Sequence, residues 1–223
     1  MSRAKTGAAR AAYCEMQLAN LAKIDIPAQA EAMGLELDGS GTKAKARFIG
    51  RDYLIGNEGV TDPSGAEVSV DTKSVLAHYL ASKGRGATSE EFVPIGRLTG
   101  VSAGASAGTS PSDQIFKPLG DKFGPDFEAF KKAALALGAE HRGLSQAGAQ
   151  SFLFASLPKL PLKAEFFEAD DEFDAEIKVL FCANATNFVM YEILELTVMC
   201  LVASMLMEAG LISDPAELQS SFI

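Results

Sequence analysis

The apolar stretch near the C-terminus constrains the fold more than any other part of the sequence. Within residues 188–207 only Glu192 and Glu195 are charged. A charge at the centre of a membrane-spanning helix costs about 2.5 to 3.5 kcal/mol. The uninterrupted part, 196–207, would extend roughly 18 Å against a hydrocarbon core of about 30 Å. The stretch therefore predicts a long helix over 188–209 that is buried in a globular domain and crosses its core.

The distribution of apolar residues favours one domain. The chain has 223 residues, of which 48% are hydrophobic, so one core can form without disulfides or metals. No proline-rich or charge-rich linker divides the sequence into two parts that each have enough apolar residues for a core. We therefore expect a single domain over residues 1–223.

The charge and the cysteine content indicate the cellular compartment and the classes of binding partner. Twenty Lys and Arg stand against 29 Asp and Glu, a net charge of -9, and such a field repels phosphate backbones and anionic membranes. Cys14, Cys182 and Cys200 form neither a disulfide framework nor a Cys-x-x-Cys motif. Residues 1–23 lack the apolar core of a secretion signal. We expect a cytoplasmic protein with no nucleic-acid partner and no membrane partner.

The first half of the chain alternates helical and extended patterns. Good helix formers predict helices over 8–23 and 27–33, the second ended by Gly34, which together make residues 1–34 an N-terminal helical segment. Apolar and charged residues alternate over 44–48, as in a half-buried strand. Further strands are expected over 53–55 and 67–70, followed by a helix that Asp71 caps and Gly84 ends.

The second half predicts a Gly/Ser-rich loop, two helices and three strands. Residues 96–110 contain four Gly and three Ser, and we expect a mobile loop there. Helices are expected from Ser110 and from Asp126, with Glu140 to Arg142 in a loop. Strands are expected over 152–154, 160–167 and 177–181. Together these patterns predict an α+β fold in which mainly antiparallel strands pack with helices around the C-terminal helix.

The densest charge in the chain lies between the last two expected strands. Seven carboxylates fall within twelve residues: Glu165, Glu168, Asp170, Asp171, Glu172, Asp174 and Glu176. Hard cations need several oxygen ligands held together, which makes Asp170, Asp171 and Glu172 candidate metal ligands. The spacing lacks the ligand order of a calcium loop, and a solvated hairpin tip has the same composition. Both interpretations stay open at this point.

Three other groups could bind a small molecule. Glu192 and Glu195 share one helix face and either line a pocket or lie near solvent in the first turns. His78 and Tyr79 lie mid-helix, where a core or capping histidine is the alternative. The Gly/Ser-rich segment could cradle phosphate through its backbone amides, or simply form a surface loop. Arg97 lies at the start of that segment. The ligand-binding candidates are therefore His78, Tyr79, Arg97, Asp171, Glu172, Glu192 and Glu195.

Several short motifs occur in an order that is similar to a known family. They are residues 76–80 with a following glycine, Phe123-Gly124, Leu137-Gly138, 157–162, and 170–173 through 179–181. The chain resembles, after about residue 40, an uncharacterised domain-of-unknown-function family of anaerobic bacteria and archaea, sometimes beside iron-sulfur or corrinoid modules. The resemblance implies a place in anaerobic cofactor or one-carbon metabolism and carries over no catalytic residue. Asp174 and Cys182 depart from the family pattern, in which proline and aspartate are usual.

Three hypotheses of function follow from the sequence. The first is an accessory protein that binds a small molecule or cofactor near the acidic segment, His78 and the Gly/Ser-rich segment. The second is a hydrolase or transferase that uses paired carboxylates, which requires a buried acid of raised pKa beside a pocket. The third is a homodimer formed through the C-terminal helix or the tail Phe222-Ile223. The sequence identifies no cofactor.

Overall fold

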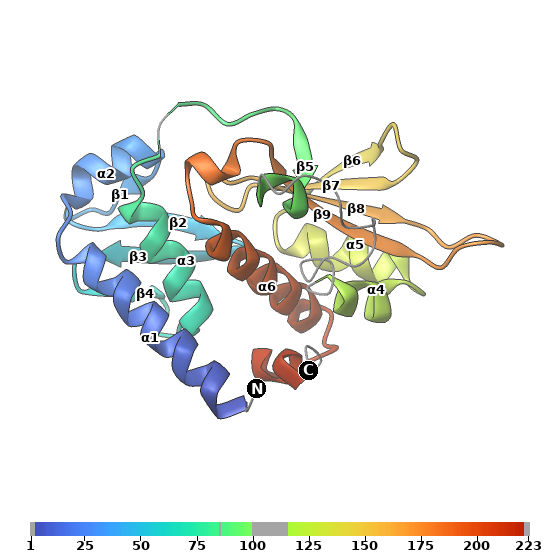
Figure 1. The fold of residues 1–223 in the computed structure, drawn as a ribbon, viewed down its shortest axis with the longest axis horizontal. Helices are drawn as coiled ribbons and strands as arrows, with labels where there is room; N and C mark the ends of the chain where they lie inside the picture. The colour runs from blue at the N-terminus through green and yellow to red at the C-terminus, as the bar shows by residue number, and fades with distance from the viewer. Residues whose placement is uncertain (1–2, 85, 100–115, 221–223) are drawn as a thin grey trace.

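Two antiparallel sheets and six α-helices make up the part of the chain that the computed structural model describes, residues 3–84, 86–99 and 116–220 (Figure 1). They form one α+β domain. The first sheet has the order β1-β2-β3-β4, with bounds Glu36–Leu37, Ala44–Phe48, Arg51–Gly56 and Gly59–Thr61. The second has the order β5-β9-β8-β7-β6, in which β5 is Phe92–Pro94, β6 Glu140–Leu144, β7 Gln150–Phe154, β8 Leu162–Phe167 and β9 Glu176–Cys182. The expected fold class is confirmed.

The first sheet forms where the alternation of side chains predicted it. Along β2 the side chains alternate strictly between buried and exposed positions, because only one face of the sheet packs on the core. The turn from β2 to β3 consists of Ile49 and Gly50, both with positive φ (46° and 78°), as a two-residue hairpin turn requires. Gly50 also lies so close to Leu137 that an added Cβ would be 2.9 Å from the Leu137 Cα.

Helices α2 (Ile26–Met33) and α3 (Val70–Ala81) cover the inner face of the first sheet, and α1 (Arg3–Leu21) forms a further layer on α3. Helix α3 contacts β3 and β4, and α2 contacts β2. Asp25 caps α2 by accepting from the Ala28 amide at 3.1 Å, and Gly34 (φ 75°) ends it as expected.

The expected strand over 67–70 and the expected Asp71 cap are wrong. Ser69 is the N-cap of α3 and accepts a hydrogen bond from the Thr72 amide at 3.2 Å, so the helix begins at Val70. Asp71 lies in the first turn and pairs instead with Arg10 at 3.3 Å. Helix α3 ends at Ala81, before Gly84. The strand that follows β3 is β4, a shorter segment nearer in sequence.

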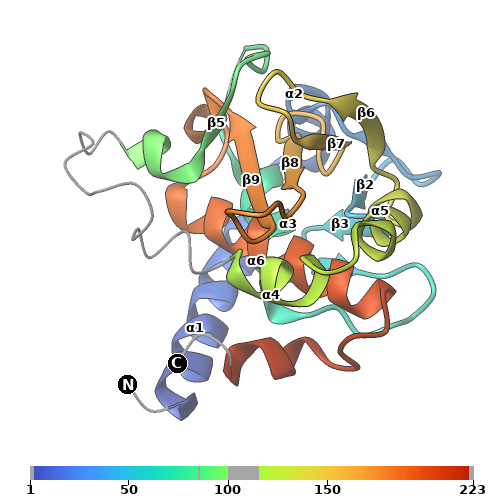
Figure 2. The ribbon, with the colours of Figure 1, turned by 90° about the vertical axis from the view of Figure 1, so that its right-hand side faces the viewer.

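The second sheet packs its inner face on α4 (Lys117–Phe123) and α5 (Phe127–Ala136), which lie together against it (Figures 1 and 2). Phe130 of α5 packs against Phe152 of β7 and Phe166 of β8, with ring centroids 5.3 and 5.2 Å apart. Residues 140–142, expected in a loop, instead begin strand β6. A bulge between His141 and Gly143 disturbs the pairing there and hides the period-2 pattern in the sequence.

Helix α6 (Tyr191–Glu208) lies between the two halves of the domain, in contact with α3 on one side and with α4 and α5 on the other (Figure 1). Ten of its residues are buried: Ile193, Leu194, Thr197, Val198, Cys200, Leu201, Val202, Ala203, Met205 and Leu206. The expectation of a buried, core-crossing helix is therefore confirmed. None of the described helices combines the length and the apolar composition that a membrane-spanning segment requires.

Short 3-10 helices complete the described chain. They are η1 (Ile95–Thr99), η3 (Ala185–Asn187) and η4 (Pro215–Ser220). Residues 96–99 of the expected mobile loop belong to η1, and 100–110 lie outside the described residues. The expected helix start at Ser110 and the tail Phe222-Ile223 also lie outside them. The three cysteines are buried and form no disulfide.

Candidate functional site

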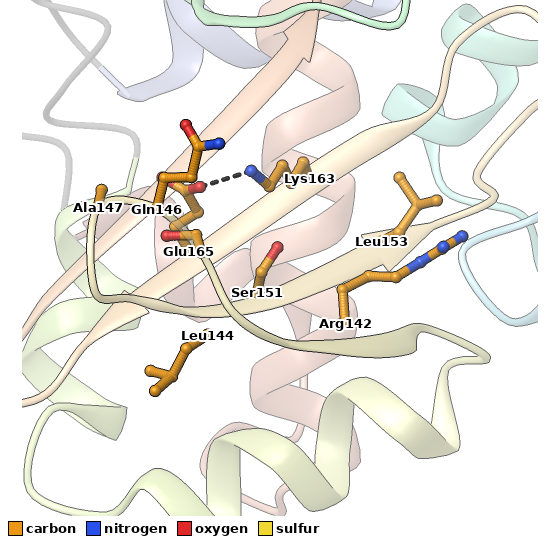
Figure 3. Close-up of a pocket in the computed structure, with 9 residues that line it drawn as sticks. Arg142, Leu144, Gln146, Ala147, Ser151, Leu153, Lys163 and Glu165 are labelled. Carbon is orange, nitrogen blue, oxygen red and sulfur yellow. Dashed lines mark hydrogen bonds and ion pairs between the residues drawn. The ribbon is translucent and has the colours of Figure 1, made fainter.

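A pocket of about 600 Å³ opens on the outer face of the second sheet, the face turned away from α5 (Figure 3). Its walls come from β6, β7, β8 and the turn between β6 and β7. The lining residues are Arg142, Leu144, Ser145, Gln146, Ala147, Ser151, Leu153, Lys163 and Glu165.

The alternation of the strands decides which side chains enter the pocket. Phe152 of β7 points inward to the rings of α5, so its neighbours Ser151 and Leu153 point outward. In the pairing of β7 with β8, Ser151 lies opposite Glu165 and Leu153 lies opposite Lys163. The four outward side chains therefore form the floor of the pocket.

The turn between β6 and β7 lies over this floor and makes it concave (Figure 3). Ser145 and Ala149 close the turn, since the Ser145 amide donates to the Ala149 carbonyl at 2.8 Å and the Ser145 hydroxyl accepts from the Ala149 amide at 3.3 Å. Gly148 (φ 82°) supplies the left-handed conformation that the turn needs. The bulge in β6 places Arg142 at the edge of the pocket.

Two polar side chains on the floor are buried. Glu165 is only 8% exposed, and its Oε1 accepts from the Lys163 ammonium at 2.6 Å. Ser151 is 3% exposed, and its Oγ has no hydrogen-bond partner in the protein. A buried hydroxyl without a partner costs about 1 to 3 kcal/mol. Ser151 therefore lines the pocket with a hydroxyl that is enclosed by protein atoms and has no partner among them.

Arg142 brings a second cation to the edge of the pocket. Its guanidinium pairs with Glu140 at 2.7 Å, and both side chains are more than half exposed. Such an exposed ion pair contributes at most about 1 kcal/mol because water and salt screen it. The Arg142 guanidinium is therefore free to exchange Glu140 for another anion at little cost.

His78 lies elsewhere, where α1, α3 and the start of α6 meet. Its Nδ1 is 3.0 Å from Gln17 Oε1, and its Nε2 accepts from the Met190 amide at 3.3 Å. The neutral ring with hydrogen on Nδ1 satisfies both contacts. Burial lowers the pKa of His78, and the charge of Glu192 opposes that effect. The structure thus brings the candidates His78 and Glu192 together.

The carboxylates of α6 act on each other and on α1. Burial, followed by the charge of Glu192, raises the pKa of Glu195. Burial and the same Glu192 charge raise the pKa of Tyr13, and the nearby Gln17 side chain partly opposes this rise. The buried Tyr13 hydroxyl makes no well-formed hydrogen bond. Neither Glu192 nor Glu195 lines the pocket on the second sheet.

Tyr79, the neighbour of His78, has a structural environment. It is fully buried, donates to the Met33 carbonyl at 2.8 Å and accepts from the Lys159 amide at 3.0 Å. Burial raises the pKa of its hydroxyl. Tyr79 therefore ties α3 to α2 and to the segment between β7 and β8.

The remaining candidates lie at the surface. Asp170, Asp171 and Glu172 are exposed at the tip of the β8–β9 hairpin, which projects from the molecule far from α3 (Figure 1). Asp170 accepts from the Glu172 and Phe173 amides, both at 2.8 Å, and these bonds lower its pKa. Arg97 is exposed on η1. Within the described ranges, no group of three or more His, Cys, Asp or Glu side chains is placed to hold a metal ion.

A family model covers most of these elements. The model described as a domain of unknown function, DUF3786, matches residues 25–204, from the cap of α2 into α6. The chain belongs to the DUF3786 family. The DUF3786 match includes the whole pocket and begins earlier than the expected residue 40. Comparisons with curated proteins and with solved structures find no match.

Proposed function

We propose that this DUF3786 protein binds a small molecule in the pocket on the second sheet and acts as a non-catalytic accessory protein. The observation that carries the proposal is Ser151, a buried hydroxyl without a partner at the floor of a pocket. A ligand that hydrogen-bonds to Ser151 Oγ would remove the cost of its desolvation. The pocket volume lies in the range of about 300 to 1,000 Å³ that is usual for small-molecule sites.

The metabolic setting of the ligand is a separate part of the proposal. The resemblance of the sequence motifs to a family of anaerobic bacteria and archaea supports a cofactor or intermediate of anaerobic metabolism. The genes that lie beside members of the DUF3786 family test this part. A consistent neighbourhood of anaerobic enzymes supports it, and a neighbourhood dominated by aerobic pathways contradicts it.

An NMR screen of fragments tests binding to the pocket directly. We expect fragments to shift the amide signals of Ser151, Lys163 and Gln146 together, because all three line the pocket. Ser151→Ala removes the hydroxyl and is expected to weaken the shared shifts. Ser156→Ala is the matched control, since Ser156 is a buried serine outside the pocket whose hydroxyl already donates to the Leu160 carbonyl.

Three results contradict the proposal. The first is a screen in which neutral, anionic and cationic fragments all leave these three amides unshifted. The second is a set of shifts that Ser151→Ala leaves unchanged, because binding would then not involve the buried hydroxyl. The third is an ordered water on Ser151 that no fragment displaces, since the water alone would satisfy the hydroxyl.

A further inference from the structure

The pocket has more hydrogen-bond donors than acceptors. Lys163 Nζ carries three N–H groups, of which Glu165 takes one in the contact at 2.6 Å. The Ser151 hydroxyl is unused, and Arg142 has five N–H groups of which the pair with Glu140 accounts for a part. Glu165, the one carboxylate among the described lining residues, already pairs with Lys163.

The charges of the lining point the same way. The described lining holds two cations, Arg142 and Lys163, and one carboxylate, Glu165, in a chain of net charge -9. The Glu140 carboxylate that pairs with Arg142 is exposed and lies outside the lining. An anion that enters the pocket therefore competes with a weak, solvent-screened pair.

The donors come from neighbouring strands. Figure 3 shows the Ser151 side chain between the Lys163–Glu165 pair and the Arg142 side. The strand register agrees, because Ser151 lies opposite Glu165 on β8 and opposite Gly143, the neighbour of Arg142, on β6. The Lys163 ammonium and the Ser151 side chain thus lie on the floor, while the Arg142 side chain extends from its edge with the guanidinium turned away from them, toward the Leu153 side.

We infer that the ligand of this pocket is an anion whose carboxylate or phosphate group lies between Lys163, Ser151 and Arg142. Oxyanions accept several hydrogen bonds at once, and a guanidinium binds them through two parallel bonds. The inference rests on the proposed function, since it names the ligand class of the same site. The Glu165 carboxylate holds the Lys163 ammonium in place beside Ser151.

Calorimetric titration with matched probes tests the ligand class. Benzoate and phenyl phosphate are the anionic probes, benzamide is the neutral one and benzylamine the cationic one. We expect an anion to bind at least about tenfold more tightly than benzamide, because charge-assisted hydrogen bonds exceed neutral ones by roughly 1 to 1.5 kcal/mol. The better of the two anions identifies the oxyanion, and its affinity falls as salt rises.

A pair of arginine variants locates the anion. Arg142→Met is expected to weaken anion binding about tenfold and to leave benzamide binding unchanged. Arg47→Met is the control, because Arg47 forms an equally exposed pair with Asp52 on the first sheet, away from the pocket. Anion binding that survives in Arg142→Met and Lys163→Met overturns the inference.

The failures of the two proposals are distinguishable. If benzamide or benzylamine binds with NMR shifts at Ser151 and the anions do not, the ligand class is wrong and the binding function stands. If no probe and no fragment of any charge reaches the pocket, both proposals fail.

Discussion

The two sheets follow the same alternation of side chains but use their outer faces differently. On the first sheet Arg47 and Asp52 lie opposite each other and form an ion pair at 3.2 Å, with both side chains more than 60% exposed. On the second sheet the Lys163–Glu165 pair is shorter, at 2.6 Å, and its side chains are only 26% and 10% exposed. The β6–β7 turn over the second sheet makes the difference. A covered outer face can form a site, whereas an uncovered one remains a solvated surface.

The inner faces of the two sheets are expected to respond alike. Phe48 of the first sheet and Phe152 of the second are both almost fully buried. Phe48→Ala and Phe152→Ala should each lower the free energy of unfolding by about 3 to 5 kcal/mol, through lost burial and a new cavity. Urea denaturation measures both. A loss under about 1 kcal/mol at either position means that one sheet is not packed as part of the common core.

The contact between the two halves is expected to depend on Gly50. Gly50→Ala would combine a positive φ with a clash against the Leu137 backbone, and should cost about 2 kcal/mol or more. Gly41→Ala is the control, because Gly41 has a similar φ (71°) with nothing within 4 Å of the added Cβ. Equal losses in the two variants would show that the Leu137 contact is unimportant.

The outer faces should differ when their ion pairs are broken. Glu165→Gln leaves Lys163 without its charged partner in a mostly covered place, and we expect a loss of about 1 to 2 kcal/mol. Asp52→Asn breaks an exposed pair and should cost less than about 0.5 kcal/mol. Thermal unfolding of both variants measures the contrast. Equal losses of stability in the two variants would show that the outer face of the second sheet is as solvated as that of the first.

The smallest expected effect is a pH dependence of stability that comes from His78, on helix α3 over the first sheet. Burial lowers the pKa of His78 below its ordinary value of 6.5. The unfolded chain therefore takes up a proton at His78 before the folded chain does, and stability is lost as pH falls from 6.5 towards the folded pKa. Above pH 6.5 the ring is neutral in both states and this contribution is constant. His78→Gln should flatten urea-derived stability between pH 7.5 and pH 5.5, and an unchanged slope would contradict the assignment.

Much of the fold could be predicted from local patterns, and the site could not. The alternation around Phe48, the Gly34 cap and the apolar residues after Glu195 each act through near neighbours in sequence, so the elements appear where expected. The polar positions Ser151 and Glu165 also show in the alternation as outward-facing residues. Their burial depends on a turn that folds back over the sheet, and a bulge disguises the strand before that turn. No periodic pattern encodes either feature.

The densest motif in the sequence illustrates the same limit. Seven carboxylates lie between 165 and 176, and their density made Asp170, Asp171 and Glu172 candidate metal ligands. In the structure these three residues lie exposed at a hairpin tip. Glu165, the first of the seven, belongs to the pocket because it lies on β8 and points outward there. Position on the fold, and not local charge density, separates these carboxylates.

The free energy of unfolding of Ser151→Ala, measured beside that of Ser156→Ala without ligand, tests the central claim most directly. We expect Ser151→Ala to be neutral or stabilising, because its hydroxyl is buried without a partner, and Ser156→Ala to lose about 1 kcal/mol with its hydrogen bond. A loss in Ser151→Ala as large as that in Ser156→Ala would contradict this expectation. The Ser151 hydroxyl would then be satisfied in the free protein and would have nothing left to offer a ligand.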